Sequence, residues 1–208
     1  MKYLVFEVPL PKDSFWIKEA RKLLKDYKVQ WNVLPYNISV LCLQEAPEHF
    51  QICSFMQGKE RFQVAPCVRY DHLEAFTSVN KKYHYVSLAP SAIQPSEQLS
   101  KMIDGIRSTA EKKNCMITNP KRMGVIIGRI PVETINLNHL QEILKNVDIH
   151  VDEYRIQNVV YLDSANRKPL DRWEFFETES IAENEYKKEY LHHLRNAGSN
   201  IQLLDPNF

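Results

Sequence analysis

The sequence has 208 residues, 44% of them hydrophobic and 25% charged, which fits one globular domain or two closely packed lobes. Its 27 basic and 26 acidic residues leave a formal net charge of +1, which excludes an overall electrostatic attraction to nucleic acid or to an anionic membrane. Any anion site must therefore come from a local cluster. With five glycines and no G-x-G-x-x-G or Walker-type string, the sequence also argues against a glycine-rich phosphate loop.

The cysteines and the apolar segments indicate where the protein works. None of the four cysteines forms a C-x-x-C pair, and we expect buried free thiols in a reducing compartment, hence a cytoplasmic protein. The apolar start, MKYLVFEVPLPKDSF, is too short for a signal peptide and is typical of a strand followed by a turn. No run of about 18 apolar residues occurs, so we expect no transmembrane helix and no membrane partner.

The first half of the chain predicts a strand, a helix, a long extended run, a second helix and then three strands. β-branched and aromatic residues bounded by prolines mark the strands, and apolar residues at helical spacing after Asp13 or Ser14 mark the first helix. The predicted elements lie at residues 3–8, 15–27, 29–43, 45–59, 61–69, 73–79 and 83–90.

The second half predicts a similar order of elements. A helix capped by Ser96 is followed by a polar loop, a strand, a short helix, a long strand, a turn, a last strand and a polar helix that ends at Gly198. These elements lie at residues 96–113, 119–122, 123–131, 137–144, 151–164, 166–169, 171–181 and 182–198. Short strands mixed with about five helices favour an α+β fold of two comparable lobes over residues 1–181, followed by a C-terminal helix and tail over residues 182–208.

Two strings resemble the signature regions of the LigT-like two-histidine phosphoesterases, the superfamily of 2′-5′ RNA ligases and cyclic phosphodiesterases. PYNISVLCLQEAPEHF is similar to the first region, a His-x-Thr or His-x-Ser string on an apolar strand. MGVIIGRIP is similar to the second, where Pro-His-x-Thr-apolar-x-Arg is usual. The segments YLVFEVPLP, YVSLAPSAIQPSEQLSKMI, VVYLDS and WEFF follow the family order, so the resemblance spans residues 1–181. It implies a bilobal fold of two antiparallel β-sheet lobes with flanking helices around a central cleft.

The family pattern has a clear chemical purpose. A strand points residues i and i+2 to the same face, so one His-x-Thr per lobe directs an imidazole and a hydroxyl into the cleft. Two imidazoles beside one phosphate act as general base and general acid because the pKa of histidine lies near the operating pH. The hydroxyls hold the phosphoryl oxygens.

This sequence departs from the pattern at the decisive positions. The first histidine slot is Asn37, and Ser39 keeps a hydroxyl two residues later; the second slot is Gly124, and its partner slot is Ile126. An amide does not titrate near neutral pH, and glycine has no side chain. No residue is therefore assigned as catalytic, and we expect a pseudoenzyme rather than an enzyme.

No other histidine restores the missing chemistry in the sequence. His84 precedes Ser87 by three residues, which places the two on opposite strand faces, so His84 is expected to be a half-exposed strand residue. His192 and His193 are adjacent on the last helix and face different directions. No His, Cys or carboxylate set has the spacing of metal ligands, so we expect neither a metal nor another cofactor.

Some capacity to bind an anion remains. Lys121, Arg122 and Arg129 bracket the second signature strand and Ser39 lies on the first, which makes these four the candidate phosphate ligands. The alternative is that the cations are ordinary charges of solvated loops. The three tryptophans are expected to pack in the core or between the lobes, and they are Trp16, Trp31 and Trp173.

Three interpretations of function remain open. The first is a catalytically degenerate 2′-5′ RNA ligase or cyclic phosphodiesterase that binds RNA or a nucleotide phosphate in the cleft without turnover. The second is an active phosphodiesterase with a non-standard residue set, such as Ser39, Arg129 and a histidine from elsewhere. The third is a protein-interaction module on the same scaffold, whose partner is another protein.

Overall fold

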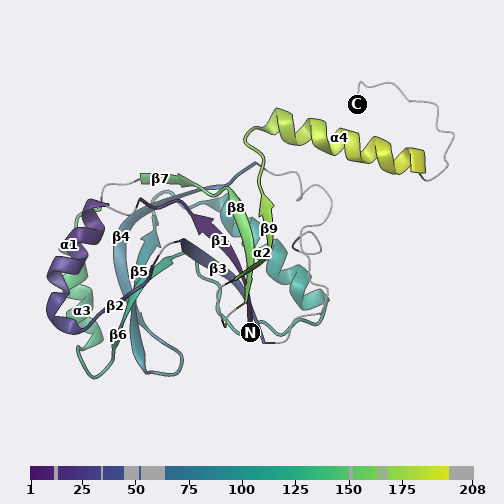
Figure 1. Cartoon of the computed structure of the whole chain (residues 1–208). Coiled ribbons are helices and arrows are strands. Elements are labelled where there is room, and N and C mark those ends of the chain that lie inside the picture. Colours follow the sequence, from purple (N-terminus) through teal and green to yellow (C-terminus); the bar gives the residue numbers. More distant parts are fainter. Residues whose placement is uncertain are drawn as a thin grey trace.

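The computed structural model describes residues 1–11, 14–33, 35–44, 52, 64–149, 152–163, 165 and 168–196. Within them the chain forms nine strands, four α-helices and one 3₁₀-helix (Figure 1). In chain order they are β1 (Lys2–Val8), α1 (Phe15–Leu23), η1 (Lys25–Tyr27), β2 (Gln30–Trp31), β3 (Tyr36–Leu43), β4 (Cys67–Thr77), β5 (Tyr83–Pro90), α2 (Glu97–Lys112), β6 (Val125–Pro131), α3 (Leu137–Leu144), β7 (Asp152–Arg155), β8 (Asn158–Asp163), β9 (Pro169–Glu174) and α4 (Glu179–Asn196).

The strands form two antiparallel sheets that confirm the predicted bilobal α+β architecture. The first sheet has the order β3-β1-β8-β9 and the second has the order β2-β6-β5-β4-β7. Helices α1 and α3 lie together beside the second sheet, and α2 lies on the far side of the first sheet (Figure 1). The two sheets are thus the inner layers and the helices the outer layers.

Alternation along the strands explains this layering. On β3, Ile38 and Val40 are fully buried, whereas Asn37 and Ser39 between them are half-buried. A strand with one apolar and one polar face packs the apolar face against a helix and leaves the other face toward the space between the sheets. The apolar stripe of α2, which includes Ile103 and Ile106, is buried in the same core.

Two predicted strand boundaries in the middle of the chain are wrong. Residues of the two strands expected at 61–69 and 73–79 belong to one long strand, β4, in which Val68 and Tyr70 are buried before a β-bulge between Tyr70 and His72, and Leu73 and Ala75 are buried after it. Residues 61–63 of the first expected strand lie outside the described residues. The single strand expected at 151–164 is two strands, β7 and β8, which belong to different sheets. The chain crosses between them at Ile156, which is fully buried and donates its N–H to the Pro66 carbonyl.

The C-terminal part also differs from the prediction. The last strand, β9, ends at Glu174 rather than at residue 181, and α4 begins at Glu179 rather than at residue 182. Helix α4 extends away from the two sheets (Figure 1). The helix predicted at 45–59 and the helix end predicted at Gly198 lie outside the described residues. Among the helices that the structure describes, none has the length and apolar character that a membrane span requires.

Candidate functional site

The space between the two sheets forms a cleft with a volume of about 820 Å³. Both sheets and the loops beside them contribute to its lining. All four family slots line it, together with Arg122 and Arg129, and these six residues come from opposite lobes: Asn37, Ser39, Gly124, Ile126, Arg122 and Arg129. The structure therefore brings the two signature regions to one site.

The wall formed by the first sheet is polar but carries few charges. Asn37 and Ser39 are on β3, and Val5 pairs with Ser39 from the neighbouring strand β1. An amide and a hydroxyl on one strand face present hydrogen-bond donors and acceptors to the cleft. Neither group is a proton-transfer catalyst at neutral pH.

In the wall formed by the second sheet, a β-bulge determines which residues of β6 line the cleft. Ser87 on β5 pairs with Glu74 on β4 and with Ile126 on β6. The register then shifts by one residue on β6, so Tyr85 pairs with Arg129. Strict alternation from Ile126 would have placed Arg129 on the opposite face of the sheet. Because of the bulge, both residues line the cleft.

The second histidine slot is closed by its neighbours as well as lacking a side chain. A Cβ atom on Gly124 would lie 2.5 Å from Ser87 Oγ and 3.1 Å from the carbonyl oxygen of Leu88. The first distance is far below van der Waals contact, and Ser87 is itself only 1% exposed. Glu74 Oε1 would lie 3.5 Å from the same Cβ. A serine hydroxyl and a carboxylate therefore border the space into which a side chain at this slot would project.

Aromatic rings hold the two cleft arginines. The guanidinium carbon of Arg122 lies 3.7 Å from the ring centroid of Phe76, and that of Arg129 lies 4.7 Å from the centroid of Tyr83. Arg129 Nε also donates to Gln30 Oε1 at 2.8 Å. A guanidinium stacked on a ring keeps its in-plane N–H donors for a planar anion. The two arginines are thus oriented cations within the cleft lining.

Of the four candidate phosphate ligands, Lys121 does not line the cleft. Lys121 Nζ lies 2.6 Å from Asp104 Oδ2 and 2.9 Å from Ser100 Oγ, both on α2. Its side chain therefore points to the outer helix, and Lys121 is not among the residues that line the cleft. The physical reason is that a nearby carboxylate on α2 binds the ammonium group.

A network of hydrogen bonds ties the loop before β6 to β3. Arg107 of α2 donates from Nη1 to the Val40 carbonyl and from Nη2 to the Asn119 carbonyl, each at 2.7 Å. Asn119 Nδ2 in turn donates to the Ser39 carbonyl at 3.4 Å. The loop that carries Arg122 is thereby held against the strand that carries Ser39, which fixes the two walls relative to each other.

The histidine predictions have mixed outcomes. His84 shares a strand face with Val86 and not with the cleft-lining Ser87, as expected from its register, but it is buried rather than half-exposed. Its Nδ1 lies 3.0 Å from Thr77 Oγ1, which satisfies a buried polar ring. In the part of the chain that the structure describes, no histidine lines the cleft. His193 is on α4, which projects from the body.

Several residues that line the cleft were not predicted as site residues from the sequence. Glu74 and Phe76 alternate with Leu73 and Ala75 on β4, and this period of two is visible in the sequence. Their position in the cleft wall depends on the pairing of β4 with β5, which in turn pairs with β6. Trp31, expected in the core or between lobes, is half-buried in the cleft lining, with the Arg21 guanidinium carbon 5.6 Å from its ring centroid.

An ion pair marks one edge of the cleft. Asp163, a lining residue, accepts a hydrogen bond from Lys2 Nζ at 2.9 Å. The backbone N–H of Ala165, followed by the Lys2 ammonium, holds the pKa of the Asp163 carboxyl below its usual range. Because Lys2 compensates Asp163, the charge of this carboxylate opposes an incoming anion less than an isolated carboxylate would.

The comparisons with known proteins agree with this geometry at the level of the fold. Neither a protein-family model nor a curated protein matches the chain. The structure of Kluyveromyces marxianus Usb1 superposes with a TM-score of 0.50 at 11% identity, over 81% of this chain and 96% of Usb1. TT0787 of Thermus thermophilus gives a TM-score of 0.48 at 13% identity, over 83% and 97% of the two chains. E. coli LigT in complex with NADP+ gives 0.46 at 13% identity, over 84% and 98%. The chain has the LigT-like bilobal fold that its sequence pattern predicts.

Proposed function

We propose that this protein binds a nucleotide phosphate, as a free nucleotide or at an RNA end, in the cleft between its sheets without turning it over. The observation that carries this proposal is the pair of oriented arginines, Arg122 and Arg129, in the lining of one open cleft with Ser39 and Asn37. Guanidinium groups give short, charge-assisted hydrogen bonds to phosphate oxygens, and hydroxyl and amide groups complete the ligand set.

The absence of turnover follows from the two histidine slots. Asn37 takes up no proton near neutral pH, and Gly124 has no side chain to deliver one. The contact distance of 2.5 Å to Ser87 Oγ means that the second slot is packed for glycine. Since a positioned proton-transfer group typically contributes about 10²–10⁴-fold, losing both removes most of the family reaction rate. The groups that stabilise phosphoryl charge remain, so binding outlasts catalysis.

The interaction-module alternative has less support. A scaffold that had lost its ligand would tend to fill the space with apolar side chains, since empty internal space costs packing contacts. Here the cleft keeps about 820 Å³ and retains two arginines.

One observation favours a second candidate, an active phosphodiesterase with an altered acid. Glu74 Oε1 lies beside the space of the second histidine slot, 3.5 Å from the position of a Cβ on Gly124. A carboxyl group is a competent general acid or base when it reaches the reacting oxygen. Under this alternative the native protein hydrolyses 2′,3′-cyclic nucleotides, and Glu74→Gln abolishes that activity.

The test is a thermal-shift titration of the native chain with adenosine monophosphate, 2′,3′-cyclic AMP and adenosine. Binding to the native state alone raises the melting temperature by mass action. The two phosphates should raise the melting temperature, adenosine should not, and Arg129→Gln should remove the effect. Arg69→Gln is the matched control, because Arg69 pairs with Glu153 at the surface and does not line the cleft. A shift with adenosine alone, or one that Arg129→Gln leaves unchanged, would contradict phosphate binding.

A further inference from the structure

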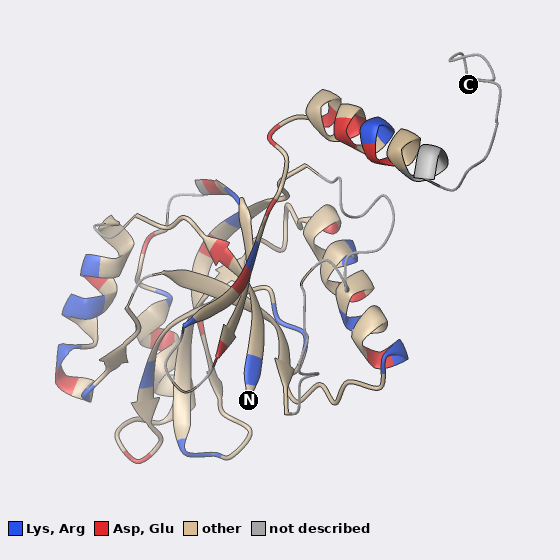
Figure 2. Cartoon of the chain, turned by 45° about the vertical axis from the view of Figure 1, so that its right-hand side comes forward, with Lys and Arg blue, Asp and Glu red and all other residues tan. Residues whose placement is uncertain are grey.

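Charge is distributed unevenly over this nearly neutral protein. Residues 18–28, which cover most of α1 and all of η1, contain five basic and two acidic residues. Residues 171–185, which run from β9 into α4, contain six acidic residues and one basic residue. Blue ribbon segments accordingly outnumber red ones on α1, and red segments follow β9 and the start of α4 (Figure 2). The molecule therefore has a basic region at α1 and η1 and an acidic segment that runs from β9 to the start of α4.

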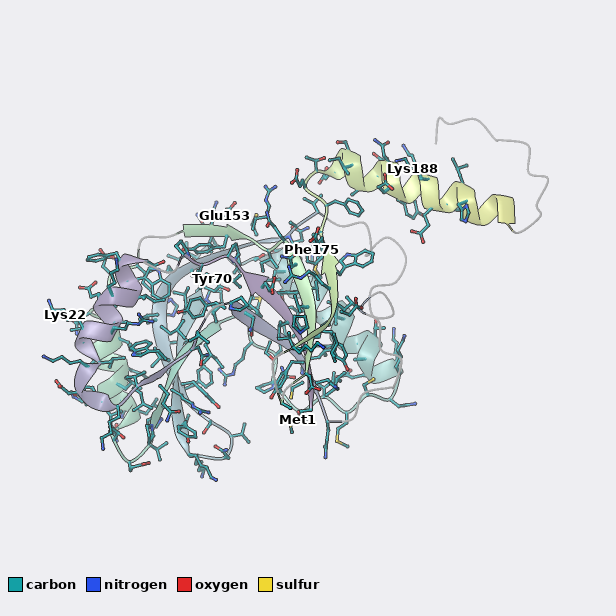
Figure 3. All side chains as sticks on the ribbon, in the orientation of Figure 1. Met1, Lys22, Tyr70, Glu153, Phe175 and Lys188 are labelled. Carbon is teal, nitrogen blue, oxygen red and sulfur yellow. The ribbon has the colours of Figure 1, made fainter. Side chains whose placement is uncertain are left out.

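The basic side is continuous with the cleft. The chain runs from α1 and η1 directly into β2, and residues 30–33 line the cleft. Arg21 of α1 stacks on Trp31 of β2, with 5.6 Å between the guanidinium carbon and the ring centroid. Beyond Arg21, the exposed side chains of Lys22 and Lys25 continue the positive surface. Figure 3 shows Lys22 on the outer side of α1, across the molecule from Lys188 on α4.

Stacked rings and guanidinium groups form a row along the second sheet, and four members of this row line the cleft: Trp31, Phe76, Arg122 and Arg129. From β2 to β4 the row contains the pairs Arg21–Trp31, Arg129–Tyr83 and Arg122–Phe76. Tyr85 packs against Phe76, with 5.6 Å between ring centroids. Bases of single strands stack on aromatic rings and on guanidinium planes, and their phosphates follow a positive groove. A duplex hides its base faces and would not use such a row.

We infer that the cleft receives a single-stranded polynucleotide whose chain leaves over the β2 edge, past Trp31 and Arg21, onto the basic face of α1 and η1. This inference rests on the proposed function and names its ligand as a strand of several nucleotides rather than a mononucleotide. The acidic residues of β9 and α4 oppose a path in the other direction, because like charges repel the phosphates. The strand therefore leaves the cleft on the α1 side.

The experiment measures fluorescence anisotropy of a labelled, mixed-sequence RNA of about ten nucleotides, a length within the usual site sizes for single strands. The full-length native protein is compared with Lys22→Glu/Lys25→Glu and with Lys101→Glu/Lys112→Glu. The second pair is the matched control: both lysines are exposed, they lie on α2, and Lys112, like Lys22, is in the last turn of its helix. Adenosine monophosphate, the matching DNA strand and the same RNA in a duplex are titrated in parallel.

The Lys22→Glu/Lys25→Glu variant should bind the ten-nucleotide strand about tenfold more weakly, whereas the α2 variant should bind it like the native protein. The slope of log K for RNA binding against log salt concentration should become shallower by about 1.4, since each of the two lost phosphate contacts contributes about 0.7 to the slope for a single strand. Affinity for adenosine monophosphate should not change. The matching DNA strand reports whether the ribose hydroxyl contributes to recognition.

Three outcomes would overturn the inference. Equal weakening by the α1 and α2 variants would show that the effect is general charge repulsion. Duplex binding as tight as single-strand binding would show that the aromatic row is not used. If the native protein bound anionic vesicles and Lys22→Glu/Lys25→Glu lost that binding but kept the native RNA affinity, the basic face would be a membrane-binding surface. Failure of the proposed function is a separate result, in which adenosine monophosphate does not bind or binds independently of Arg129.

Discussion

The two walls of the cleft differ in the side chains that they present. The first sheet presents Asn37 and Ser39, an amide and a hydroxyl on one strand face. The second sheet presents Gly124 and Ile126, neither of which has a polar side chain, and Arg122 and Arg129 lie in the same lining. Asn37 is half-buried at the open cleft, whereas the Gly124 position is closed by Ser87 Oγ. The two positions thus differ in packing as well as in chemistry.

The two positions differ in the room that they leave for a side chain. A side chain at position 37 lies on an open strand face of the cleft. A Cβ at position 124 would lie 2.5 Å from Ser87 Oγ and 3.1 Å from the Leu88 carbonyl oxygen, so its neighbours must shift to admit it. We propose that phosphate binding depends mainly on the second wall, through Arg122 and Arg129.

The largest expected effect concerns activity. The native protein should hydrolyse 2′,3′-cyclic nucleotides at the background rate, whereas Asn37→His/Ser87→Ala/Gly124→His/Ile126→Thr should gain activity. Each restored acid or base is worth about 10²–10⁴-fold, and Ser87→Ala removes the atom that blocks the second slot. Chromatography of the nucleotide products measures the rates. Native activity that disappears in Glu74→Gln would contradict this prediction and favour the altered-acid alternative.

The next effect concerns binding by the two walls. Arg122→Gln/Arg129→Gln should weaken binding of adenosine monophosphate by at least about a hundredfold, because each charge-assisted hydrogen bond is worth about 1.5–3 kcal/mol. Ser39→Ala, on the other wall, loses one neutral hydroxyl and should cost about tenfold or less. Isothermal titration calorimetry measures both. If Ser39→Ala lost more affinity for adenosine monophosphate than the double arginine variant, the first wall rather than the second would be the main phosphate-binding wall.

A smaller effect concerns stability at the two slots. Gly124→His should lower the free energy of unfolding by about 1–3 kcal/mol, because its Cβ overpacks against Ser87 and Leu88. Asn37→His, at the open slot, should change it by less than about 1 kcal/mol. Urea denaturation of both variants checks the difference. Adding Ser87→Ala to Gly124→His should recover part of the loss; if it recovers none, Ser87 is not what closes the slot.

The smallest effect concerns pH at the cleft edge. The lowered pKa of Asp163 means that its charged form is favoured in the folded state. Its stabilisation is therefore present above the ordinary aspartate pKa of about 3.9 and is lost as the pH falls through the lower folded pKa. Asp163→Asn should lower the melting temperature slightly near neutral pH and have a diminishing effect below about pH 4. Asp26→Asn, at an exposed position of η1, is the control, and an Asp163→Asn effect that grows toward low pH would contradict the sign.

The sequence was sufficient for the fold and for the position of the first wall. Alternation along β3 predicts that Asn37 and Ser39 face the cleft, because period two needs no knowledge of partners. Beyond Ser39 a register shift between β3 and β1 makes Cys42, rather than Leu41, a lining residue. The second wall depends on long-range pairing that no local pattern contains. The β-bulge on β6 places Arg129 on the cleft face. Asp104 on α2 binds the ammonium group of Lys121 and holds it away from the cleft. Glu74 on β4 lies beside Gly124. Each of these facts joins residues distant in the sequence.

The most direct test of the central claim is to measure binding and turnover in one sample. The native protein is titrated with 2′,3′-cyclic AMP by calorimetry, and the nucleotide is then recovered and separated by chromatography. Saturable binding that Arg129→Gln removes, with the cyclic phosphate recovered intact, is the predicted result. Recovery of a ring-opened nucleotide monophosphate, or no binding by the native protein, would contradict a cleft that holds a phosphate without turning it over.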